Sequence, residues 1–500
     1  MKTISYIMLA TLLLVAVACG NKSDRLQELI PERPSMVVRM DLARICASNG
    51  MSGEGGELTL PAEVRTMLEE QAHSYVARVV KTLPASGIDF TKSAYIYSAS
   101  TELEVEMLAP LSDAGAAEKW VCGLCNETGM QSAKGIDYVT DGRVIYAIKG
   151  DVLLVGVAKS GSNIARLTEA VAATMNRSGK SLADNKAIGE ILAGEGDAVG
   201  YFAVPALLKQ PQLKRMSLGG LPVIDVLGGM EIDALAVTMN TGKTLDVEAR
   251  VMAKPTAAYK VAFGSVVSKP SAEVLAVMPA SMEIILSASL RGNVLLQMQP
   301  VRSLMVVGRQ FPIIRDFDFD KILNTIDGPV AVGVSTDSDF IDSYNVVVAM
   351  ATTDTGAVIG ELDRVAAKYG KPAQQAGGER IYEYFNQRIT VGVHGNRYVY
   401  FKINTEDIDN TPVSDGELRR LFAESPVCAT VRGEGMEVAF ALESSEKIKC
   451  KVKTADGEPS MLPVLLEGLC GMDTNRAIDD DDFGDDSYGG AVPIDEMTGF

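Results

Sequence analysis

The sequence predicts an α+β fold made of two tandem, internally duplicated halves of antiparallel sheet with flanking helices. Short segments of alternating apolar and polar residues are separated by Gly-Asp and Gly-Asn pairs, which is typical of antiparallel hairpins. Amphipathic helices are inserted between groups of hairpins, without the strict strand–helix–strand alternation of a doubly wound sheet. The same order of elements also occurs twice along the 500 residues.

The clearest copies of the repeat are residues 95–158 and 332–403. Each begins with two alternating strands and continues with a helix that starts at an Asp-x-Gly-Ala motif, at Asp113 and Asp354. Each ends with a three-strand meander. The matches "PSMVVRM" with "ASMEIIL" and "GMEIDALAVT" with "GMEVAFALES" extend the repeat on both sides. Generic α+β patterning in two unrelated stretches is the alternative interpretation.

The repeat and the composition divide the chain into seven predicted segments. They are a signal peptide (1–18), a lipidated tether (19–29), a first repeat half (30–252), a junction (253–275), a second repeat half (276–456), a C-terminal helical segment (457–472) and an acidic tail (473–500). The tail holds nine acids against one arginine, so self-repulsion predicts disorder there.

One long amphipathic helix is expected in the first half. Its first turn contains Pro61, where a missing backbone N–H costs little. A single apolar stripe predicts its buried face: Val64, Met67, Leu68, Ala72, Tyr75, Val76, Val79, Val80 and Leu83.

The N-terminus carries a targeting signal. Lys2 precedes an apolar run, from Ile4 to Ala18, that is too short to span a membrane and predicts a secretory signal peptide. The run ends in small residues directly before Cys19, and such signal peptides resemble those of bacterial lipoproteins. The resemblance implies that Cys19 becomes the acylated N-terminus and attaches the chain to the outer membrane. An ordinary secretory peptide followed by a chance cysteine is the alternative.

Composition limits the partners. The net charge of −18 argues against nucleic acid or an anionic lipid surface, because both require a basic face. No later segment approaches about 18 consecutive apolar residues. We therefore expect a chain that is tethered by lipid and is otherwise water-soluble.

The stretch "KWVCGLC" is close to a thioredoxin signature. A redox pair needs its first cysteine at a helix start, where the dipole lowers the thiol pKa, but this helix is expected to begin near Asp113. The repeat alignment puts Cys125 opposite Ala366 and Cys122 opposite Asp363. We therefore predict that Cys125 packs in the core and that Cys122 faces solvent, with a structural link or redox activity as alternatives.

Metal and cofactor motifs are incomplete, so we predict no metal, no cofactor and no catalytic residue. The two histidines, His73 and His394, are expected to be exposed. "NRSGKS" (176–181) has Thr174 where a phosphate-binding loop requires its first glycine. The acidic cluster at 479–482 lacks the ligand spacing of a calcium loop. Carboxylate pairs for hydrolysis have no fixed spacing, so a hydrolase remains possible as an alternative function.

An aromatic patch is expected on two neighbouring strands of the second half. It comprises Tyr382, Tyr384, Tyr398 and Tyr400. Cross-strand packing is one interpretation and a ligand platform is the other.

As a whole, the sequence resembles the large uncharacterised lipoproteins of the Bacteroidota. The features that carry this resemblance are the lipoprotein-like start, the length, the first segment of the body between Pro31 and Asp41, and the duplicated body. This resemblance implies an outer-membrane lipoprotein and provides no active-site residues. A single acid, Asp24, lies close to Cys19, so a periplasmic and a surface-facing orientation both stay open. We therefore expect a non-enzymatic, lipid-anchored envelope protein that binds or assembles with an unknown envelope protein or ligand. The alternatives are an envelope-polymer hydrolase and a carrier of lipid or another apolar ligand.

Overall fold

The structure is a computed structural model. It describes residues 25–51, 58–100, 102–159, 161–209, 217–218, 221–222, 229–298, 301–302, 315–336, 344–369, 374–376, 378–384, 387–405, 408–433, 435–454 and 460–479. The expected signal peptide, the lipid attachment site Cys19 and most of the acidic tail lie outside these residues.

Ten strands of the main sheet come from the first half of the chain. They are β1 (Met36–Asp41), β2 (Ser93–Ser98), β3 (Leu103–Pro110), β4 (Gln131–Ala133), β5 (Ile136–Thr140), β6 (Val144–Lys149), β7 (Val152–Ala158), β8 (Ala198–Ala203), β11 (Ile232–Asn240) and β12 (Thr244–Ala253). All their pairings are antiparallel, in the spatial order β4-β5-β6-β7-β3-β2-β1-β8-β11-β12.

The second half contributes ten more strands. They are β13 (Ile284–Arg291), β14 (Ile326–Thr336), β15 (Tyr344–Thr352), β16 (Gln374–Ala376), β17 (Glu379–Tyr384), β18 (Gln387–His394), β19 (Tyr398–Ile403), β20 (Val427–Gly433), β21 (Met436–Ser444) and β22 (Lys447–Thr454). Their spatial order, β16-β17-β18-β19-β15-β14-β13-β20-β21-β22, repeats that of the first half strand for strand. The expected α+β fold with two internally duplicated halves is confirmed.

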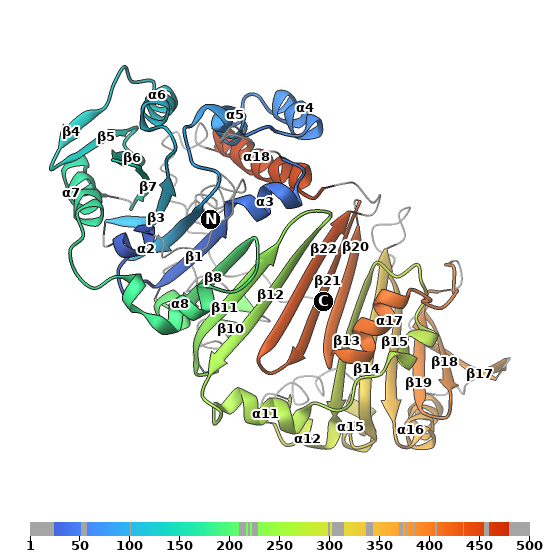
Figure 1. The fold of residues 1–500 in the computed structure, drawn as a ribbon. Coiled ribbons are helices and arrows are strands. Elements are labelled where there is room, and N and C mark those ends of the chain that lie inside the picture. The colour runs from blue at the N-terminus through green and yellow to red at the C-terminus, as the bar shows by residue number, and fades with distance from the viewer. Residues whose placement is uncertain are drawn as a thin grey trace, which may run out of the picture.

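The two halves form one sheet because β12 pairs with β22 (Figure 1). Val247 lies opposite Cys450 at the centre of this pairing, and Leu245 lies opposite Val452. Each half thus contributes its last strand, and the two strands run antiparallel. This is the geometry of a two-fold symmetric interface, here formed within one chain.

Helices cover both faces of the first half. One face packs against α3 (Leu42–Ser48), α4 (Ala62–Glu70), α5 (Tyr75–Thr82) and α6 (Ala114–Cys125). The other packs against α2 (Arg25–Leu29), α7 (Ile164–Met175) and α8 (Lys186–Leu192). The helix α2 corrects the expected tether, since Leu26 is buried in this second cluster and the chain is folded from Arg25 onward.

The second half has the same two-sided plan with fewer described helices. The helix α16 (Thr355–Lys368) corresponds to α6 and packs on one face, together with α15 (Phe319–Leu323). The helix α17 (Gly416–Glu424) and the 3₁₀ helix η5 (Ala272–Val277) pack on the other. In chain order, α17 precedes β20 as α8 precedes β8, so α17 and α8 are equivalent elements.

Two helices that follow the last strands cross to the opposite half. The helix α18 (Leu462–Asp479) packs on α4 and α5 of the first half, and it begins and ends later than the helical segment expected at 457–472 (Figure 1). The helix α11 (Ala258–Val266) follows β12 and contacts β13 and α12 (Gly292–Leu295) of the second half. Within the described residues, no helix has the length and apolar composition needed to cross a bilayer.

The single long helix expected in the first half is wrong. The structure has two helices, because the backbone leaves the helical path after Glu70 and Ser74 then caps α5 by accepting a hydrogen bond from the N–H of Ala77. The predicted stripe is nevertheless buried at Val64, Met67, Leu68, Val76, Val79, Val80 and Leu83. Ala72, which lies between the two helices, is exposed.

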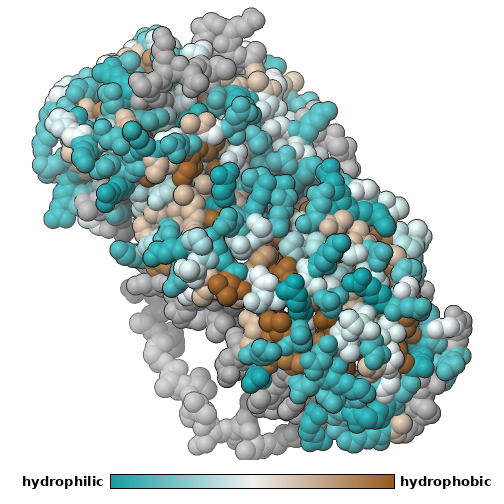
Figure 2. All heavy atoms as spheres, turned by 60° about the horizontal axis from the view of Figure 1, so that its bottom comes forward, coloured by the Kyte–Doolittle hydropathy of each residue, from teal (hydrophilic) through white to brown (hydrophobic). Residues whose placement is uncertain are grey.

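At the junction the two faces of the sheet differ in chemistry. The face that bears Asp246 and Lys451 is charged, and we call it the groove face. The other bears Val247, Cys450 and Phe440, which lie in one cross-strand row, and we call it the apolar face. Figure 2 shows hydrophobic residues reaching the surface in the middle of the molecule, with hydrophilic residues around them.

Candidate functional site

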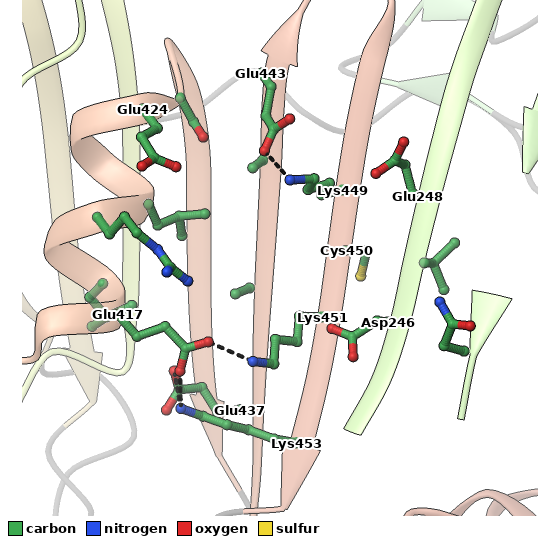
Figure 3. Close-up of a pocket in the computed structure, with 18 residues that line it drawn as sticks. Asp246, Glu248, Glu417, Glu424, Glu437, Glu443, Lys449, Cys450, Lys451 and Lys453 are labelled. Atoms are coloured by element: carbon green, nitrogen blue, oxygen red, sulfur yellow. Dashed lines mark hydrogen bonds and ion pairs between the residues drawn. The ribbon is translucent and has the colours of Figure 1, made fainter. Parts of the chain in front are cut away.

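The candidate site is a pocket of about 540 Å³ on the groove face, where the two halves meet (Figure 3). The first half supplies β12 and Asn240 at the end of β11, and the second half supplies β21, β22 and α17. Because residues of both halves line it, the pocket depends on the β12–β22 pairing.

One wall of the pocket is α17, which begins at a defined cap. The carboxylate of Asp415 accepts hydrogen bonds from the backbone N–H groups of Glu417 (2.7 Å) and Leu418 (3.1 Å). These hydrogen bonds hold the pKa of Asp415 below its usual value. Leu418 and Phe422 anchor the inner side of the helix in the core of the second half.

The floor of the pocket is a ladder of opposite charges. Strand β22 reads "KIKCKVK", so every second side chain from Lys447 to Lys453 projects from the groove face. Strand β12 places Asp246 opposite Lys451 and Glu248 opposite Lys449. A basic strand of one half therefore lies against an acidic strand of the other.

Ion pairs connect the floor to the wall. The Lys451 ammonium lies 2.6 Å from a Glu417 oxygen, and Lys453 lies 3.6 Å from the other oxygen of Glu417 (Figure 3). Lys449 pairs with Glu443 at 2.5 Å on the far side of the floor. The Lys451 hydrogen bond lowers the pKa of Glu417 and is matched by a raised pKa of Lys451.

A second lysine, Lys447, also interacts with Glu443 at the far side of the floor. Burial raises the pKa of Glu443, but Lys449 and Lys447 outweigh it, so the pKa of Glu443 is lowered. The paired carboxylates of the floor are therefore held in their charged form.

Some charged side chains that line the pocket form no ion pair with the described residues. Six carboxylates and four cationic side chains line it. Among the described residues, Glu424 and Arg420 on α17 make no ion pair, and Asp246 accepts a hydrogen bond only from its neighbour Thr244 (2.6 Å). The pocket thus keeps an acidic excess that its own residues do not neutralise.

A larger pocket of about 920 Å³ lies beside the equivalent helix of the first half, α8. Its other walls are β8, β11 and the C-terminal part of β12, continued by Lys254 and Lys260. The duplication therefore produces two pockets at corresponding places, one on each side of the junction.

The two cysteines of "KWVCGLC" lie in the last turns of α6, well after its cap at Asp113. Cys122 is buried with 5% of its surface exposed, whereas Cys125 is half-buried, so the expectation that Cys122 faces solvent is wrong. The helix ends at Cys125, with Asn126 in the left-handed conformation, and this ending leaves the last side chain partly open. Burial raises the pKa of the Cys122 thiol, and burial together with Asp141 raises that of Cys125 to about 12.

The remaining expected residues also have definite places. His73 and His394 are exposed. Tyr382 is buried on one face of the sheet and donates a hydrogen bond to Asp363 (2.7 Å), while Tyr398 is buried in the cluster on the other face. The expected tyrosines therefore do not form one platform, and the side chain of Tyr384 lies outside the described residues.

Sequence reasoning did not find the pocket residues. The signal that could have found them is the strict alternation of lysine in "KIKCKVK", which predicts a strand with one fully basic face and hence an acidic partner strand. The sequence "LDVE" of the equivalent first-half strand supplies those acids.

Comparison with protein-family models gives no match, and comparison with curated proteins gives none either. Among solved structures, three crystal forms of a protein named TP0453 are similar in part. Form III has a TM-score of 0.27 at 12% identity and covers 45% of this chain and 78% of that one. Form I has a TM-score of 0.27 at 10% identity, covering 47% and 80%, and form IV has a TM-score of 0.23 at 11% identity, covering 38% and 81%.

Proposed function

We propose that the chain is a non-enzymatic, lipid-anchored protein of the cell envelope that binds a partner at the pocket between its two halves. The anchor is Cys19, attached to the outer membrane, as the lipoprotein-like start implies. Membership in the large Bacteroidota lipoproteins is part of the same proposal.

One observation carries the binding role: the pocket is built by both halves and retains charges that no described residue pairs. Glu424 and Asp246 lie on its wall and floor and add to an excess of carboxylates. A polar partner segment that carries positive charge supplies the missing partners. Such contacts also steer association and fix orientation.

The lowered carboxyl pKa values favour docking over hydrolysis. A glycosidase needs one carboxylic acid with a raised pKa to protonate the leaving group. The pKa values of Glu417 and Glu443 move in the opposite direction because lysines pair with them. Carboxylates that stay ionised suit a recognition surface and not a general acid.

The binding test uses two defined peptides of equal length, one alternating Lys with Ser and one alternating Glu with Ser. We expect the lysine peptide to bind and its affinity to fall steeply with added salt. Glu424→Gln should weaken this binding without destabilising the fold, because Glu424 makes no ion pair with the described residues. Asp246→Asn should weaken it too, at a small cost in stability, because Asp246 lies opposite Lys451. Glu118→Gln, on the exposed side of α6, is the matched control. Equal binding of both peptides would count against a recognition site for positive charge.

The anchor is tested separately in cells. Wild type should incorporate labelled palmitate and fractionate with the outer membrane, and Cys19→Ala should lose both properties. Retention of label in Cys19→Ala would refute the anchor and leave the pocket proposal untouched.

A further inference from the structure

The larger pocket beside α8 has a chemistry of its own. Its walls are mainly apolar and come from α8, β8, β11 and β12: Ile188, Ile191, Tyr201, Ala203, Ala234 and Met252. The small side chains of Ala203 and Ala234 leave room on the strand side, whereas Ile188 and Ile191 form the helix side. Its volume of about 920 Å³ lies within the range of small-molecule sites, about 300–1,000 Å³.

Cationic side chains surround this apolar space. Four of them line it, against two carboxylates. One pair is internal, because Lys260 lies 2.5 Å from Glu446. Arg33, Arg250 and Lys254 make no ion pair with any described residue, and the single carboxylate left beside them is Asp233.

This excess of positive charge runs against the charge of the whole chain. A net charge of −18 disfavours a broad anionic surface as a partner, yet this pocket concentrates three unpaired cations in one place. An apolar cavity with cations around it complements a molecule with an apolar chain and an anionic head. The smaller pocket across the junction has the opposite balance and few apolar walls.

We propose that this pocket binds a single-chain anionic amphiphile, with its alkyl chain between α8 and the strands and its head group against Arg250, Lys254 and Arg33. Met252 lies on the strand that carries Arg250, and 36% of its surface is exposed. In the proposed complex its side chain covers part of the ligand's alkyl chain. Binding of an amphiphile here is separate from the proposed docking of a polar partner at the other pocket and does not depend on it.

The test uses isothermal titration calorimetry on the chain from Gly20 onward, which keeps every described residue and needs no detergent. The probes are alkyl carboxylates, alkyl phosphates and alkyltrimethylammonium salts of matched chain length, below their micelle concentrations. We expect both anionic series to bind, with about fourfold tighter binding for each added CH₂ until the pocket is full. The cationic series should bind at least tenfold more weakly at equal length. Tighter binding of carboxylates identifies free fatty acids as the ligand class, and tighter binding of phosphates identifies single-chain lipids that carry a phosphate.

Variants separate the pocket from general adsorption. Arg250→Gln with Lys254→Gln should weaken anionic binding about tenfold, and Met252→Asp should weaken it at every chain length. Arg420→Gln, at the corresponding pocket across the junction, should leave it unchanged. Equal binding of anionic and cationic probes, or equal effects of the Arg250→Gln Lys254→Gln pair and of Arg420→Gln, would overturn the proposal.

Discussion

Individual thiols show how burial decides reactivity. Cys122 and Cys125 have the spacing of a redox pair, but they lie at the end of α6, where the helix dipole does not favour a thiolate. Burial also raises the pKa of Cys46, Cys428 and Cys450, that of Cys428 to about 12. These sulfurs act as packing atoms.

The folded chain should therefore react slowly with thiol reagents. With a pKa of about 12, about one Cys125 thiol in ten thousand is ionised at pH 8. We expect Cys122 and Cys125 to react with Ellman's reagent far more slowly in the native chain than in urea. Reaction of Cys125 at pH 7 as fast as a small free thiol would contradict the packing role.

A buried carboxylate in the first half is a second residue-scale case. Glu106 on β3 is 1% exposed and accepts hydrogen bonds from the hydroxyls of Tyr97 and Thr174, both at 3.1 Å. Burial raises its pKa above the usual value, and the two hydrogen bonds offset only part of that cost. The folded state therefore holds this proton more tightly than the unfolded state does.

The resulting pH dependence has a definite sign. The contribution of Glu106 to stability is fully present below its unfolded pKa, about 4.3, and is lost as pH rises through the higher folded pKa. Relative to Glu106→Gln, the wild type should therefore lose stability as pH rises above about 4.3, measured by urea unfolding. Glu118→Gln, at an exposed site, should show no such trend. A pH-independent difference between wild type and Glu106→Gln would show that folding does not raise the pKa of Glu106.

Among elements, the repeated helix starts were the most predictable feature. Asp113 caps α6 by accepting from the N–H groups of Gly115 (2.9 Å) and Ala116 (3.0 Å), and Asp354 caps α16 through Ala357 (2.9 Å). The hairpin turns at Gly150 and Gly395 were equally predictable from their Gly-Asp and Gly-Asn pairs. Both glycines adopt the positive φ that such turns require. Local chemistry determines such features, and local sequence reveals them.

The two caps should contribute equally to stability if the halves are true copies. We expect Asp113→Ala and Asp354→Ala each to lower the free energy of unfolding by about 1 kcal/mol, with Asn at either position costing less. Guanidinium unfolding measures both. A cost confined to one copy would show that the two helix starts have diverged.

Elements that depend on distant contacts were not predictable. The apolar stripe of residues 64–83 reads as one helix, and only the cap at Ser74 reveals the break. The helix α18 belongs to the second half by sequence, yet its residues Leu466 and Cys470 are buried in the first. No local pattern encodes that crossing, because the surface that buries them is assembled by α4 and α5.

At the scale of the whole molecule, β12 and β22 are equivalent strands of the two halves whose sequences have diverged. This divergence suits their pairing with each other within one chain. If β22 paired with a second β22 in the same register, Lys449 would lie opposite Lys451. If β12 paired with a second β12, Asp246 would lie opposite Glu248. Only the mixed pairing places opposite charges together, which contributes about 0.2–1 kcal/mol for each pair. The sequence showed the duplication, whereas the joining of the halves becomes visible only in the β12–β22 register, which places opposite charges together.

Reversing the acidic strand tests that complementarity. Asp246→Lys with Glu248→Lys places like charges opposite Lys451 and Lys449 and should destabilise the chain by about 1–3 kcal/mol. The neutral pair Asp246→Asn with Glu248→Gln should cost less. The difference between the two should shrink in 1 M salt, where charges are screened within about 3 Å. Equal stabilities at low salt would mean that charge does not select the partner strand.

The pocket between the halves requires a sheet that is continuous through β12 and β22, and a single cross-link tests this continuity most directly. Cys450 lies opposite Val247, and paired residues of antiparallel strands have Cα atoms about 4.5–5.5 Å apart, within disulfide range. We expect oxidised Val247→Cys to form a link between positions 247 and 450 in high yield, found by mass spectrometry of the digested protein. Leu245→Cys, which faces Val452, should link to Cys450 far less. No link in Val247→Cys, or an equal yield from Leu245→Cys, would contradict the shared sheet and the pocket built on it.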